Sequence, residues 1–107
     1  MVINNEAVNK LINQYIADVR KVMPIEKIFL YGSYAKGTVG KYSDVDICFF
    51  SNAFESRRIF DVLTDLFYLK IKYDKDILIE PFAYPLSELY NDNPFVKEIL
   101  RTGLDIT

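Results

Sequence analysis

Two short apolar segments set the fold class of this chain. Lys27 to Tyr31 is a β-prone run, and Asp44 to Phe50 is a second one with two acids at its leading end. An amphipathic segment from Asn5 to Met23, with apolar residues at helical spacing, precedes both runs. Because Pro24 cannot continue that helix, the chain leaves it before the first strand. The pattern predicts a sheet that is covered by helices.

The middle of the chain repeats the same kinds of element. Glu55 to Lys72 carries an apolar stripe at helical spacing, and Asp76 to about Phe82 predicts a third strand. Pro81 and Pro85 are expected to close that strand, and Leu86 to Tyr90 is expected to form one short helical turn. The order up to this point is α-β-β-α-β.

A last helix has clear signals at both of its ends. Asn93 is a suitable N-cap with Pro94 at the first helical position, and Gly103 is well placed to end the helix. Leu104 to Thr107 is expected to pair as a last edge strand. Residues 1–107 are therefore predicted to form a single domain of the α/β (α+β) class, a small mixed β-sheet with helices packed on one face.

Composition excludes several classes of function. Half of the 107 residues are hydrophobic and 26% are charged, with a formal net charge of -2, which argues against a general nucleic-acid-binding surface. Cys48 is the only cysteine and there is no histidine, so an intrachain disulfide, a thiolate zinc site and His-based catalysis are all excluded. No apolar run approaches the ~20 residues that span a bilayer, so we expect a cytoplasmic protein that does not bind membranes.

One constellation carries the chemistry. Gly32 and Ser33 are followed by ten residues and then by Asp44-Val-Asp46. Gly32 ends a strand and lets the backbone approach a ligand closely, and Ser33 opens a short helix whose N–H groups suit a β- or γ-phosphate. Side chains alternate along a strand, so Asp44 and Asp46 project to the same side and can both ligate Mg²⁺ or Mn²⁺. We expect the metal to bind together with the substrate phosphates.

Two-metal phosphoryl chemistry needs a third carboxylate near the acceptor hydroxyl. Asp76 and Glu80 are both available in the third predicted strand, and their spacing of four places them on one face. We prefer Asp76 because it lies at the start of its strand, as Asp44 does; Glu80 remains the alternative. Lys36 and Lys41 lie between the Gly-Ser pair and the acids, where each is either a triphosphate ligand or a solvated loop residue.

Each part of the constellation also has a simpler explanation. A Gly-Ser pair after a strand is common in turns, and an Asp-x-Asp at a strand start can simply protect a sheet edge. The combination, with every part at a strand boundary, favours a nucleotide site. The chain contains neither a P-loop motif nor a dinucleotide-binding motif.

The same residues resemble the signature of the DNA polymerase β superfamily, in particular its minimal single-domain nucleotidyltransferases. Asp76 to Pro81 is similar to the segment that holds the last catalytic acid of that family, and Asn93 to Gly103 is similar to its closing helix. The resemblance implies transfer of a nucleoside monophosphate from an NTP to a hydroxyl with two divalent ions. It places Gly32 and Ser33 on the triphosphate, both Asp44 and Asp46 on the metals, and Asp76 as third ligand and proton acceptor.

The resemblance also implies a partner. Minimal members often act as antitoxins that adenylylate a tyrosine of a HEPN-type toxin, which implies ATP as the substrate and a HEPN-like toxin as the acceptor. A chain of 107 residues builds a catalytic sheet but leaves little protein to recognise an acceptor, which favours an acceptor on another chain. Homo- and hetero-oligomers are both open. The alternatives are a non-catalytic module that masks its partner, and transfer to the hydroxyl of a small molecule.

Overall fold

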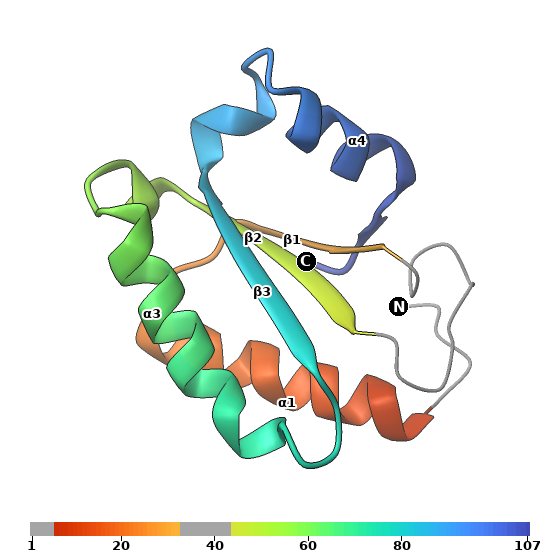
Figure 1. Ribbon diagram of the computed structural model, residues 1–107. Coiled ribbons are helices and arrows are strands. Elements are labelled where there is room, and N and C mark those ends of the chain that lie inside the picture. The colour runs from red at the N-terminus through yellow and green to blue at the C-terminus, as the bar shows by residue number, and fades with distance from the viewer. Residues whose placement is uncertain (1–5, 33–43) are drawn as a thin grey trace.

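The structure of the chain is a computed structural model that describes residues 6–32 and 44–107. The described residues form helices and strands in the order that the sequence predicts, and short 3₁₀ turns lie between some of them (Figure 1). In chain order the elements are α1 (Glu6–Val22), β1 (Lys27–Tyr31), β2 (Val45–Ser51), η1 (Asn52–Glu55), α3 (Ile59–Lys70), η2 (Ile71–Tyr73), β3 (Ile79–Pro85), η3 (Leu86–Leu89), α4 (Pro94–Thr102) and β4 (Leu104–Asp105).

The four strands form one mixed sheet in the order β3-β2-β1-β4. β1 pairs antiparallel with both β2 and β4, whereas β2 and β3 are parallel. α3 lies on the connection between β2 and β3, as a parallel pair requires. The predicted α+β class with a mixed sheet is confirmed, and so is the last edge strand.

One face of the sheet is closed by α1 and α3 (Figure 1). Alternate residues of the strands point into this core, which contains Ile28, Leu30, Val45, Ile47, Phe49, Ile79 and Ala83. Tyr15 of α1 is fully buried, and its hydroxyl donates a hydrogen bond of 2.9 Å to the carbonyl oxygen of Leu66 in α3. The two helices are therefore tied to each other as well as to the sheet.

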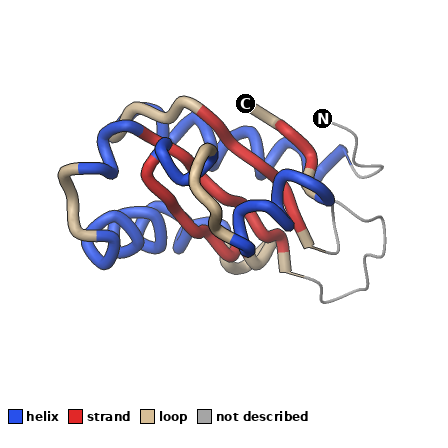
Figure 2. The backbone as a smooth tube through the Cα atoms, turned by 90° about the horizontal axis from the view of Figure 1, so that it is seen from above, coloured by secondary structure: helices blue, strands red, loops and turns tan. Residues whose placement is uncertain are grey.

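The opposite face carries α4, so the expectation that all helices share one face is corrected. Val96 and Ile99 of α4 pack on Phe29, Cys48 and Phe50, which are the strand residues that point away from the first core. Figure 2, seen from above, shows α4 in front of the strands. Because these strand residues are apolar, a second layer of protein has to shield them from water, and α4 provides it. Burial raises the pKa of the Cys48 thiol, as expected for an inert core cysteine.

The predicted helix from Glu55 is shorter than expected, because a 3₁₀ turn precedes it. The hydroxyl of Ser51 accepts a 3.1 Å hydrogen bond from the Ala53 amide and donates one of 2.6 Å to the Pro24 carbonyl. These bonds hold the chain in η1, and α3 begins only at Ile59. Such side-chain caps compete locally with helix formation.

The third strand is displaced along the chain relative to its predicted position. It begins at Ile79 rather than Asp76, because the amides of Asp76 and Ile77 bond back to the Tyr73 carbonyl and hold a turn. It also runs through Pro81 instead of ending there. β3 is an edge strand, where a residue without an N–H is tolerated.

The C-terminal segment agrees with its sequence signals. The Asn93 side chain accepts hydrogen bonds from the amides of Phe95 and Val96 at 3.0 and 3.2 Å, which caps α4. A Cβ at Gly103 would lie 2.5 Å from the Ile99 carbonyl oxygen, so glycine is needed where the helix ends. None of the helices among the described residues is long and apolar enough to cross a membrane.

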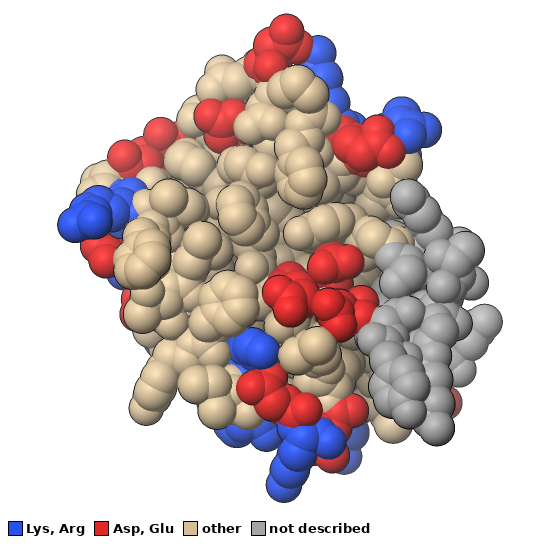
Figure 3. Space-filling view, in the orientation of Figure 1, with Lys and Arg blue, Asp and Glu red and all other residues tan. Residues whose placement is uncertain are grey.

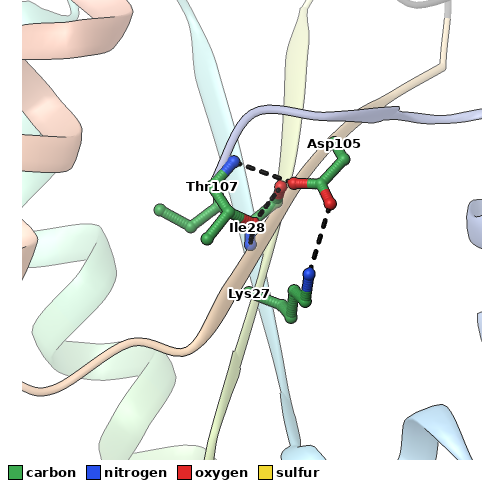
Figure 4. A network of polar contacts seen from close by, with 4 residues as sticks. All are labelled: Lys27, Ile28, Asp105 and Thr107. Atoms are coloured by element: carbon green, nitrogen blue, oxygen red, sulfur yellow. Dashed lines mark hydrogen bonds and ion pairs between the residues drawn. The ribbon is translucent and has the colours of Figure 1, made fainter.

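Polar contacts hold β4 on β1 (Figure 4). The Ile28 amide donates a 3.0 Å hydrogen bond to the Thr107 hydroxyl, and Lys27 Nζ lies 3.4 Å from the Asp105 carboxylate. Asp105 in turn accepts a 2.9 Å hydrogen bond from the Thr107 amide. Hydrogen bonds from Thr107, with a smaller contribution from Lys27, lower the pKa of the Asp105 carboxyl.

Candidate active site

The acids of the site lie in one row on two neighbouring strands, β2 and β3. In the sheet register Asp46 of β2 is opposite Tyr31 of β1 and beside Glu80 of β3. Asp44 comes directly before β2, two residues from Asp46, so the alternation of the strand points both carboxylates to the same side. Figure 3 shows acidic side chains gathered near the middle of this view of the surface.

Gly32 lies against this row of acids. Its φ is +72°, a backbone conformation that residues with a Cβ rarely adopt. A Cβ at this position would also overlap the carboxylate of Asp46. The backbone after β1 and the Asp46 side chain therefore approach each other as closely as glycine permits. Ser33, Lys36 and Lys41 lie outside the described residues.

Within the described ranges, the charges around the Asp46 carboxylate are those of other acids. Burial, followed by the nearby charges of Asp44 and Glu80, raises the pKa of Asp46. Among residues 6–32 and 44–107, none of these three acids takes part in an ion pair. The site thus concentrates negative charge that a bound cation would neutralise.

The chemistry of these side chains suits a hard divalent cation. All three supply carboxylate oxygens, the donors that Mg²⁺ and Mn²⁺ prefer. In the part of the chain that the structure describes, no group of three His, Cys, Asp or Glu residues is already arranged around a common point. The residues fit a site of the kind in which one or two carboxylates and the substrate phosphates share the coordination.

Asp76, the preferred third acid of the sequence analysis, lies outside β3. It is exposed in the turn before β3, and it borders a hollow whose other lining residues include Asp18 of α1 and Lys72 of η2. The premise that Asp76 and Glu80 share one strand face was wrong, because the strand begins only at Ile79. The structure places Glu80, the alternative, at the register position beside Asp46.

A pattern in the sequence could have favoured Glu80. Ile79, Pro81 and Ala83 alternate with Glu80, Phe82 and Tyr84, and the first three are the buried ones. Extending this alternation puts Glu80 on the face away from the first core, which is also the face of Asp46. Asp76 lies outside the alternating run.

Comparisons with known proteins identify the family of this chain. A model of the nucleotidyltransferase domain family matches residues 12–101, a range that contains Gly32, Asp44, Asp46 and Glu80. The crystal structure at 1.40 Å of a proposed nucleotidyltransferase from Sulfolobus solfataricus has a TM-score of 0.66 and 18% identity, over 90% of this chain and 76% of that one. At that identity the likeness concerns the fold. A comparison with curated proteins found no match. Since the family model spans most of its length, this chain belongs to the nucleotidyltransferase domain family.

Proposed function

We propose that the chain transfers a nucleoside monophosphate from an NTP to a hydroxyl group at the row of Asp44, Asp46 and Glu80. The observation that carries this proposal is the register of β1, β2 and β3, which sets Asp46 beside Glu80 with Gly32 against it. Membership of the nucleotidyltransferase domain family supports the same reaction class. Ser33 is proposed, with Gly32, to contact the triphosphate.

The reaction assigns a task to each acid. The acceptor oxygen forms a bond to the α-phosphorus, the bond from that phosphorus to the pyrophosphate oxygen breaks, and the hydroxyl proton leaves. Asp44, Asp46 and Glu80 would hold Mg²⁺ or Mn²⁺, and Glu80 is also proposed to accept the proton from the acceptor. Two such ions, when bound, stabilise charge on the attacking and leaving oxygens.

The experiment compares three variants, Asp46→Asn, Glu80→Gln and Asp76→Asn. Each removes one carboxylate charge with little change in shape. We expect the first two to lower Mg²⁺-dependent release of pyrophosphate on the order of 10³-fold, because each removes several kcal/mol of transition-state stabilisation. Asp76→Asn is the matched control and should retain near wild-type turnover.

Two results would contradict this assignment. If Asp46→Asn turned over at the wild-type rate, the acid row would not be catalytic. If Asp76→Asn were inactive and Glu80→Gln active, the third acid would be Asp76 after all. Circular dichroism of all three variants establishes that each is folded before its rate is compared.

We propose further that the nucleotide is ATP and that the acceptor is a tyrosine of a HEPN-like toxin, so that the chain acts as an antitoxin. The resemblance to minimal nucleotidyltransferases supports this, and so does one surface. The side chains of Phe60, Tyr68 and Ile71 are exposed on α3 and η2, which pack on the face of the sheet opposite the acid row. Apolar surfaces of this kind often mark protein interfaces.

The same surface also favours a second candidate function, neutralisation of the partner by binding alone. Incubating the co-purified pair with α-labelled ATP and Mg²⁺ distinguishes the two. Label on a partner tyrosine, present with the wild-type chain and absent with Asp46→Asn, supports transfer. Full neutralisation by Asp46→Asn without any label supports masking. Label that appears only on an added alcohol supports a small-molecule acceptor.

A further inference from the structure

Four aromatic side chains form a connected group on the same face of the sheet as the acids. The ring centroids of Tyr31 and Phe95 lie 6.3 Å apart, those of Phe95 and Tyr84 6.4 Å, and those of Tyr84 and Phe82 5.1 Å. They come from β1, β3 and the first turn of α4. Contacts at these distances fix the rings against one another. We call these four residues the aromatic wall.

The aromatic wall borders the acid row directly. Tyr31 is the register partner of Asp46, and Phe82 follows Glu80 by two residues on the same face of β3. The aromatic wall and the acid row are therefore neighbours on one face of the sheet.

Part of the aromatic wall remains open to solvent. Deeper in the same face Cys48 and Phe50 are fully buried, whereas Tyr31, Phe82 and Tyr84 are only partly covered and Phe95 is 54% exposed. In Figure 3 the surface directly above the acidic cluster, toward α4, is uncharged. Partly exposed rings beside a charged site are costly to leave in water unless something covers them.

We propose that the aromatic wall binds the base of the nucleoside triphosphate. This rests on the proposed function, because the acid row and Gly32 would take the phosphates. The base of a bound nucleotide is planar and uncharged, and it must lie within one nucleotide's length of the acids. Aromatic rings stack on any base, so the wall supplies affinity more than a choice between bases. Phe82 and Phe95 carry the stacking, and Tyr31 and Tyr84 hold those two rings in place.

The test measures binding rather than turnover. Phe82→Leu and Phe95→Leu each remove a ring and keep an apolar side chain, and Phe67→Leu does the same at an exposed position of α3 as the matched control. Each protein is titrated with a non-hydrolysable NTP and with inorganic tripolyphosphate, both with Mg²⁺. We expect each of the first two variants to weaken NTP binding roughly 5- to 150-fold, the range of one lost base stack. Tripolyphosphate binding should be unchanged in all three.

Three results would overturn the base-binding role. Unchanged NTP affinity in both Phe82→Leu and Phe95→Leu would show that the base lies elsewhere. Equal losses for the NTP and tripolyphosphate would show that the rings only support the acid row. An increase in the KM of the acceptor at constant NTP affinity would assign the wall to the acceptor.

The same titrations separate this inference from the proposed function. If the wild-type chain binds NTP and the two variants bind it more weakly, the wall binds the base even if no acceptor is ever modified. If transfer proceeds and the variants bind NTP normally, only the base-binding role fails. A wild-type chain that binds no NTP would overturn both.

Discussion

At the scale of single residues, the charge of Asp46 is unfavourable for the stability of the fold but is needed by the proposed cation site. Its carboxylate is partly buried, lies against Gly32 and has two other acids as neighbours. Nothing in the folding of the sheet needs a charge there, because the row is on the face away from the first core. A charge that is kept at a cost to stability is typical of a functional site.

Because this charge is unfavourable without a metal, we expect Asp46→Asn to stabilise the metal-free protein at pH 7. Since the pKa of Asp46 in the folded state is raised above its ordinary 3.8, the folded chain holds the proton more tightly than the unfolded one. The free energy of unfolding therefore falls as the pH rises through the window above 3.8, and the full penalty applies at neutral pH. Urea unfolding of both proteins in EDTA, at pH 3 and at pH 7, measures the difference.

Asp105 provides the opposite control. Its pKa is lowered by Thr107 and Lys27, so its charge stabilises the fold above its ordinary pKa of 3.8, and this contribution is lost as the pH falls through the lower folded value. Asp105→Asn should therefore be slightly less stable than wild type at pH 7. If Asp46→Asn were also less stable at pH 7, and equally so at pH 3, crowding of the acids would not be the dominant effect.

At the scale of elements, local signals predicted what local interactions determine. α4 was predicted from Asn93, Pro94 and Gly103. In the structure Asn93 caps the helix, Pro94 is its first residue and Gly103 follows its last one, and their contacts are with residues nearby in the sequence. The start of β3 could not be predicted in this way, because a turn around Tyr73 and the register with β2 determine it. The expectation that Asp76 starts this strand was wrong for that reason.

The Asn93 cap gives the prediction at this scale. Asn93→Ala removes the acceptor for the amides of Phe95 and Val96, and we expect a loss of about 1 kcal/mol in the free energy of unfolding. Asn91→Ala is the control, since Asn91 also contacts Glu88 but caps no helix. Urea denaturation followed by circular dichroism measures both. Equal losses in the two variants would show that the contact with Glu88 matters rather than the cap.

At the scale of the whole molecule, the two faces of the sheet have different tasks. α1 and α3 pack on one face, whereas α4 covers part of the other, where the acid row and the aromatic wall are partly exposed (Figure 1). The period of two in the strands made it predictable that alternate residues face opposite sides. The position of α4 on the second face was not predicted, because sequence alone does not show which face a helix covers or how far it extends over it.

Because the first core and the proposed site lie on opposite faces of the sheet, we expect substitutions to change the stability of the fold and its affinity for NTP separately. Tyr15→Phe keeps the ring contacts with Phe49 and Tyr73 but removes the buried hydrogen bond to Leu66. We expect a loss of about 1 kcal/mol in the free energy of unfolding, with no change in NTP affinity, because the bond lies on the closed face. Tyr68→Phe, at an exposed position of α3, should change neither quantity. A variant at Tyr15 that stays folded but binds NTP more weakly would show that the closed face also determines the geometry of the acid row.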